Sequence, residues 1–188
     1  MRIASSPFLL KKVRINHFMK KIFWPFLIIF FLTLFCFIPI FSAFTFTETR
    51  TEHPSIHFIP LEKKDHFQII FTHTIHLTDV IENYRVLESN EIKLASMQYS
   101  DVAIGMPGYA EEGQTLRYEN GVYTLKYDKA VLKDFILHIG DVDNKLDFHY
   151  NEKSFDLKEE LDRGKSYEFK IKKISLFEKV KGVELNER

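Results

Sequence analysis

The longest uncharged stretch of the chain runs from Ile22 to Thr47, and its first twenty residues are almost wholly apolar. A helix rises about 1.5 Å per residue, so about 20 apolar residues cross the hydrocarbon core of a bilayer. A helix of this length in a soluble core would need a polar face, and this stretch has none. Residues 22–46 are therefore predicted to form a transmembrane helix, with Trp24 as an aromatic anchor at the interface.

The charges that flank this segment predict its orientation. Residues 1–21 contain six bases and no acid, whereas Arg50 is the only base close after the segment. The six bases are Arg2, Lys11, Lys12, Arg14, Lys20 and Lys21. The positive-inside rule then places the N-terminus in the cytoplasm and the rest of the chain outside it. The prediction is a single-pass protein of the cell membrane, with the lipid bilayer as its first partner.

A cleaved signal peptide is the alternative. Its apolar region is usually about 7–15 residues long and ends in a small-x-small site. Ala43 would supply the small residue at the cleavage point, but Phe41 would occupy the other small position. These features favour an uncleaved anchor. Cys36 follows Phe35 and does not fit a lipoprotein site, and as the only cysteine it excludes a disulfide framework and a multi-cysteine metal site.

The chain's charge is balanced overall but not locally. It has 26 Lys and Arg against 26 Asp and Glu, so the part after the first six bases carries 20 bases and 26 acids. This acidic remainder argues against binding to nucleic acid, which requires clustered Lys and Arg. Residues 47–66 contain Pro54 and Pro60 and are predicted to be a linker. His53 and His57 have a spacing that would suit a metal only on a helix, and solvated histidines are predicted instead.

Residues 67–188 are predicted to form one extracytoplasmic all-β domain. Apolar and polar residues alternate with a period of two, which is typical of half-buried strands. Strands are expected near 67–75, 80–86, 92–99, 116–119, 122–125, 135–139, 145–150, 155–157 and 167–171, with a short helical turn at 158–163. Short strands separated by turns predict an antiparallel β-sandwich or a partly open barrel.

Two hairpins are predicted in register. A loop at 76–79 would place Ile75 opposite Val80 and His73 opposite Glu82, on one largely apolar face. The dipeptide Asn120-Gly121 is the strongest short hairpin signal, because both turn positions need positive φ. This second hairpin would pair residues 119 with 122, 118 with 123 and 116 with 125.

One set of motifs resembles a known family. Thr72-His73-Thr74, then Glu82 and Tyr84, then Gly105-Met106-Pro107 occur in the order and spacing of a bacterial family known only as domain of unknown function 1850. The resemblance covers about residues 67–157. Members often occur beside tripartite (TRAP-type) solute transporters, so the resemblance implies a transport-linked role with a transporter subunit as a partner. It implies no catalytic residues and no cofactor.

The predicted pair of His73 and Glu82 is the leading site candidate. A carboxylate beside an imidazole favours the protonated ring, while burial opposes its charge. The pair would fix the hairpin register, contact a ligand, or act in acid–base chemistry. A metal at His73 and His76 with Asp79 or Glu82 would require a bend, because residues three apart on a strand face opposite sides. Weaker candidates are Thr72, Thr74, His76, Tyr84, Gly105 and Pro107.

Three functions remain open from the sequence. The first is an accessory or ligand-binding module linked to solute transport, and the second is an envelope enzyme that uses His73 and Glu82, with or without a metal. The third is a structural envelope protein. No Gly-x-Ser-x-Gly elbow and no phosphate-binding glycine loop occur in the sequence. No catalytic residue, metal site or cofactor is therefore assigned.

Overall fold

The computed structural model describes residues 17–102 and 105–188. The chain divides into two units, with the boundary between Ile38 and Pro39. The described part of the first unit contains helix α1, His17–Phe35, with Pro25 inside it. Among the described residues, no helix combines the length and the apolarity needed to cross a membrane. The predicted cytoplasmic segment 1–21 lies mostly outside the described residues.

The apolar stretch changes structure at Pro39. Helix α1 ends four residues earlier, and strand β1 runs from Pro39 to Glu48. Proline has no backbone N–H and disfavours helical geometry in the residue before it, so a helix that continued through Pro39 would be interrupted. The prediction of one helix over 22–46 was wrong for its last eleven residues, of which residues 39–46 lie in β1. Phe44 and Phe46 are fully buried in the β domain.

The predicted linker also contains a strand. Strand β2, Ile56–Pro60, pairs antiparallel with β1, so that Phe44 lies opposite Ile59. Phe58 and Ile59 are buried, whereas the residues between the two strands are mostly exposed. The β domain therefore begins at Pro39 and not at residue 67, and the linker-like parts of 47–66 are the two connections between strands, 49–55 and 61–65.

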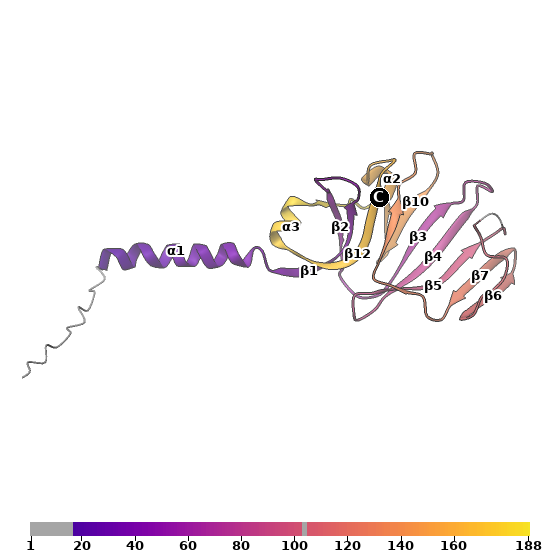
Figure 1. The fold of residues 1–188 in the computed structure, drawn as a ribbon, viewed down its shortest axis with the longest axis horizontal. Coiled ribbons are helices and arrows are strands. Elements are labelled where there is room, and N and C mark those ends of the chain that lie inside the picture. The colour runs from indigo at the N-terminus through magenta and orange to yellow at the C-terminus, as the bar shows by residue number, and fades with distance from the viewer. Residues whose placement is uncertain (1–16, 103–104) are drawn as a thin grey trace, which may run out of the picture. The chain divides into compact units, whose positions relative to one another are not determined.

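Two sheets form the domain (Figure 1). The five-stranded sheet has the order β13-β2-β1-β12-β9, and the larger sheet has the order β11-β10-β3-β4-β5-β7-β6, with β8 paired to β5. The other strands are β3 His66–Thr72, β4 Asp79–Val86, β5 Ile92–Tyr99, β6 Gln114–Glu119, β7 Val122–Tyr127, β8 Val131–Leu132, β9 Asp134–His138, β10 Leu146–Tyr150, β11 Lys153–Asp156, β12 Ser166–Ser175 and β13 Val183–Glu184. All pairings except β13 with β2 are antiparallel, which confirms the predicted mainly antiparallel β fold.

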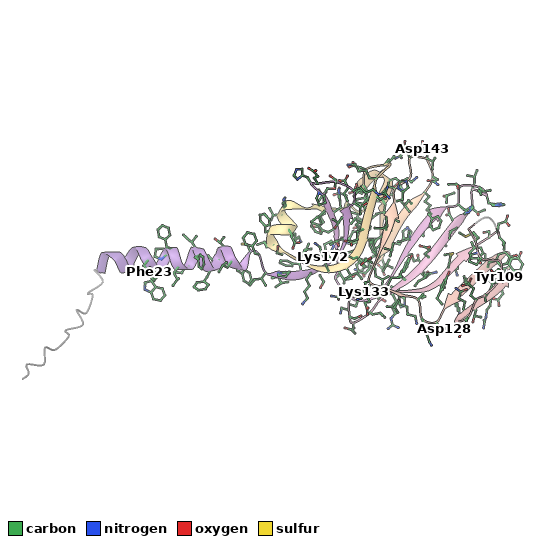
Figure 2. The ribbon with its side chains drawn as sticks, viewed as in Figure 1. Phe23, Tyr109, Asp128, Lys133, Asp143 and Lys172 are labelled. Carbon is green, nitrogen blue, oxygen red and sulfur yellow. The ribbon has the colours of Figure 1, made fainter. Side chains whose placement is uncertain are left out.

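Aromatic side chains join the two sheets. The ring of Phe44 in β1 lies 5.1 Å from the ring of Phe67 in β3, centroid to centroid. Phe148 in β10 lies 5.1 Å from Phe44 and 5.8 Å from Phe169 in β12. Offset and edge-to-face ring pairs at such distances add to the free energy gained by burial. Side chains accordingly fill the space between the sheets (Figure 2).

Two short helices follow strands of this domain. Helix α2, Leu157–Glu160, is a single turn capped by Asp156, whose carboxylate accepts from two backbone N–H groups. It confirms the predicted turn, although it begins one residue earlier. Helix α3, Leu176–Lys181, follows β12 and was not predicted. Its apolar residues are exposed, so they produce no pattern of a helix that packs on a core.

Candidate functional site

A pocket of about 520 Å³ opens between strands of both sheets. Strands β3 and β4 supply one wall, and β9 with the connection to β10 supplies the other. Its described lining is mainly apolar and includes Ile69, Phe71, Tyr84, Leu132, Phe135, Leu137, Val142 and Leu146. The polar lining consists of Thr72, His73, Thr74, Glu82, His138, Asn144, Lys145 and Lys158. A mostly apolar pocket of this size with a few polar groups is typical of a small-molecule site.

The pocket contains one inward-facing carboxyl group, that of Glu82. Strand β4 turns Val80, Glu82 and Tyr84 to the same face, and Val80 and Tyr84 are buried. The Tyr84 hydroxyl donates a 2.7 Å hydrogen bond to Glu82 Oε2. Burial raises the pKa of Glu82 above its ordinary value of 4.5, and the bond from Tyr84 opposes that rise only in part. In residues 17–102 and 105–188, no ion pair includes Glu82.

Tyr84 is fixed as a hydrogen-bond donor. Burial raises the pKa of its hydroxyl, and the neighbouring Glu82 carboxylate raises it further. Its ring stacks on Phe67 at 4.9 Å and on Phe135 at 5.7 Å, between centroids. Because both ring faces are covered, the hydroxyl direction is set by packing, and the Glu82 carboxyl is held in turn.

The predicted register of the first hairpin was wrong. The structure pairs Ile69 with Glu82 and Phe71 with Val80, so His73 does not lie opposite Glu82. Strand β3 ends at Thr72, and His73 opens a loop in which its backbone N–H donates to Thr78 O at 2.8 Å. The pairing differs by an even number of residues, so Ile69, Phe71 and Glu82 keep their predicted face, whereas Ile75 is exposed in the loop.

His73 nevertheless lines the same pocket as Glu82. Its Nδ1 accepts a 3.4 Å hydrogen bond from the backbone N–H of Ile75, which holds the ring against its own loop. Thr72, Thr74 and Tyr84, three of the weaker candidates, line this pocket as well. The loop after β3 thus brings together most of the predicted site residues, although the predicted hairpin contact does not form.

A salt-bridged group supports the pocket mouth. Thr72 Oγ1 donates to Asp79 Oδ1 at 3.1 Å, and Lys145 Nζ lies 3.1 Å from Asp79 Oδ2. The Asn144 side chain donates to Thr72 O at 3.1 Å. These bonds join the loop after β3 to the segment before β10, and they neutralise the Lys145 charge at the mouth.

The three other weak candidates lie outside the described pocket lining. His76 Nδ1 is 2.9 Å from Asp101 Oδ2, and its ring is 6.0 Å from that of His73, between centroids. Pro107 O accepts a hydrogen bond from the Tyr99 hydroxyl, and Gly105 has a φ of +90°. In the described part of the chain, no group of three or more His, Cys, Asp or Glu residues could hold a metal ion.

Comparison with family models gives a match for the part of the chain that contains this pocket. Residues 67–157 match DUF1850, a domain of unknown function. The match supports the resemblance to that domain-of-unknown-function family. No curated protein and no solved structure matches the chain.

The DUF1850 segment and the pocket nearly coincide. Of the described lining residues, Lys158 is the one outside residues 67–157. The core needs more than the DUF1850 segment, however, because β1, β2 and β12 all lie outside it.

Sequence reasoning missed Lys158. It is buried, and its ammonium group donates to Val142 O and to Asn144 Oδ1, both of which are uncharged acceptors. Burial lowers its pKa. No local sequence pattern marks this residue, because it lies in a one-turn helix and its acceptors are 14 and 16 residues earlier in the chain.

Proposed function

We propose that the β domain binds a small, mainly apolar molecule whose polar group interacts with Glu82. The observation that carries this proposal is a half-buried carboxyl group, without an ion pair to a described residue, in a mostly apolar pocket of about 520 Å³. A buried charge is costly unless it is paired or neutralised, so a ligand that supplies a hydrogen-bond donor or a cationic group removes that cost. The fixed Tyr84 hydroxyl holds the carboxyl in one orientation for such a contact.

The proposal continues to the location of the domain. We infer an accessory or ligand-binding module on the extracytoplasmic side of the cell membrane, linked to a solute transporter. The sequence supports this with the uncharged stretch at 22–47 and the six bases that precede it. The match to DUF1850 supports it through the resemblance to a family that often accompanies such transporters. A reporter enzyme that works only in the cytoplasm should be inactive when it is fused to the C-terminus. Activity of this fusion would contradict the proposed location.

Blocking the pocket mouth tests ligand binding. Thr74 lines the pocket and is exposed, so Thr74→Trp places an indole at the mouth without burying it in the core. The probe is N-phenyl-1-naphthylamine, an apolar amine whose fluorescence rises in apolar sites. We expect fluorescence above that of the probe in the same detergent without protein, and an affinity for T74W that is about tenfold lower, or roughly 1.4 kcal/mol.

Thr115→Trp is the matched control, because Thr115 is exposed on β6 and lies outside the described lining. Equal affinity of T74W, T115W and the unchanged chain would show that the probe does not enter this pocket. Absence of probe binding in all three would count against an apolar ligand.

A second candidate function is an enzyme of the cell envelope. The observation that favours it is the shared pocket of His73 and Glu82, in which the carboxyl has a raised pKa. His73→Ala separates the two functions. If the domain is a binding module, H73A keeps most of its affinity for the probe, and neither chain hydrolyses a panel of ester and amide substrates. If the domain is an enzyme, the unchanged chain hydrolyses one of these substrates and H73A does not.

A further inference from the structure

Lys158 brings a positive charge to the same mainly apolar pocket that contains Glu82. It lies in α2 and is 8% exposed, so it has lost most of its contact with water. Two of its three ammonium protons have uncharged acceptors, Val142 O and Asn144 Oδ1. In residues 17–102 and 105–188, no carboxylate forms an ion pair with Lys158, and no hydrogen bond joins it to Glu82. The third ammonium proton is therefore left for a group from outside the chain.

The acids nearest to Lys158 do not neutralise it by contact. Asp143, labelled in Figure 2, lies 2.6 Å from the guanidinium group of Arg163. Asp156 accepts from two backbone N–H groups as the N-cap of α2, and Asp141 is exposed. These three carboxylates favour the charged form of Lys158 and Arg163 opposes it, but burial is the largest effect and lowers the pKa of the ammonium group. The charge of Lys158 therefore lacks a partner in contact.

Asn144 holds the ammonium group in place. Its side-chain amide donates to Thr72 O at 3.1 Å, and its carbonyl oxygen accepts from Lys158. The neighbouring Lys145 lies 3.1 Å from Asp79, so of the two lysines in the described lining, Lys145 has an acid partner and Lys158 has none. A donor that is already fixed in position costs a ligand little in ordering.

We infer that the ligand of this pocket is an apolar acid, whose anionic group accepts a hydrogen bond from the third N–H of Lys158. This inference rests on the proposed binding function and adds the chemical class of the ligand. A hydrogen bond from an ammonium group to an anion is stronger than one between neutral groups. The described polar lining contains one acid, Glu82, against two lysines and two histidines, so its charge favours an anion. The group that donates to Glu82 and the anionic group are then two different parts of one ligand.

Displacement of N-phenyl-1-naphthylamine from the full chain in a non-ionic detergent tests the class of the ligand. The competitors are 4-phenylbutanoate and 4-phenylbutan-1-ol, which share an apolar body and differ in charge. The unchanged chain should be emptied of probe by the acid at a lower concentration than by the alcohol. Because the alcohol also enters micelles, the deciding quantity is the ratio of the two concentrations, compared between chains.

The variants assign this preference to Lys158. K158M removes the ammonium group and keeps an unbranched side chain, so the preference for the acid should fall about tenfold from the unchanged chain to K158M. K133M is the matched control, because Lys133 is exposed and lies outside the described lining, and it should keep the preference. K158Q retains N–H donors for Val142 O and Asn144 without the charge, and it should lose the preference in the same way as K158M.

The outcomes separate this inference from the proposed function. Probe that binds in the pocket but is displaced equally well by the acid and the alcohol would overturn the inference and leave the binding function standing. An acid preference that is the same in K158M and K158Q as in the unchanged chain, or that K133M loses as well, would also overturn it. Absence of probe binding, or equal probe affinity of T74W and the unchanged chain, would overturn both.

Discussion

Phe44 offers a direct test of where the apolar N-terminal stretch ends. It is fully buried, and its ring centroid lies 5.0–5.1 Å from three others, those of Phe67, Phe148 and Tyr150. Replacing a core phenylalanine by alanine costs about 3–5 kcal/mol, because apolar burial is lost and a cavity remains. A domain of this size is stable by about 5–15 kcal/mol, so Phe44→Ala removes a large share of its free energy of unfolding.

The measurement is urea unfolding of the full chain in detergent micelles, followed by far-UV circular dichroism. With a urea slope of about 1–3 kcal/mol per molar, we expect the midpoint to fall by about 2 M. Phe30→Ala in α1 is the matched control, since Phe30 is 57% exposed, and its midpoint should not move. If Phe44 belonged to an apolar helix surrounded by detergent, F44A and F30A would behave alike. That result would refute the assignment of residues 39–46 to strand β1.

Two further changes test the pocket carboxyl and the best-predicted turn. Because the pKa of Glu82 is raised in the folded protein, its contribution to stability is present below the ordinary value of 4.5 and is lost as pH rises through the raised value. Glutamine cannot ionise, so Glu82→Gln does not lose this contribution. The urea midpoint of E82Q minus that of the unchanged chain should therefore increase from pH 4 to pH 8. A difference that stays constant over this range would contradict the raised pKa. Gly121 has a φ of +82°, so Gly121→Ala should lower the free energy of unfolding by about 1 kcal/mol. Gly140→Ala, where an added Cβ meets Val142 at an ordinary 3.9 Å, should change it little, and equal effects would contradict the turn argument.

The hairpin at residues 120–121 was fully predictable from sequence. All three predicted pairs are confirmed: Glu119 with Val122, Tyr118 with Tyr123 and Leu116 with Leu125. A two-residue turn leaves no freedom in register, because the turn geometry itself fixes which residues face each other. The two turn residues were therefore sufficient to predict the register of this hairpin.

The first hairpin shows where local pattern stops being sufficient. Alternation correctly predicts that Phe71, Glu82 and Tyr84 face inward, but pairings that differ by an even number of residues keep those faces unchanged. The loop decides between them, and its bonds are backbone ones, such as Leu77 N–H to His73 O at 2.9 Å with Leu77 at a φ of +53°. A leucine at positive φ gives no turn signal in the sequence. The inward position of Glu82 was therefore predictable, but its partner was not.

The end of the apolar stretch was misjudged for a related reason. Phenylalanines that face lipid and phenylalanines that face a protein core contribute equally to a hydropathy count. Pro39 was the available signal, since it marks a place where a helix is disfavoured. The strand that follows pairs with β12, and the paired residues lie between 119 and 136 positions apart in the chain. No local window contains that information.

The long-range origin of the core also decides which part of the chain is needed to form the pocket. The DUF1850 segment supplies nearly all of the described pocket lining, but its rings at Phe67 and Phe148 pack on Phe44 and Phe169, which lie outside it. Without β1 and β12, those rings and the wall that carries Glu82 would face solvent. Since β9 forms the opposite wall only by pairing with β12, the pocket itself depends on strands outside the matched segment. The unit that forms the pocket around Glu82 and Tyr84 is therefore residues 39–188, and the segment that carries the family motifs is one part of it.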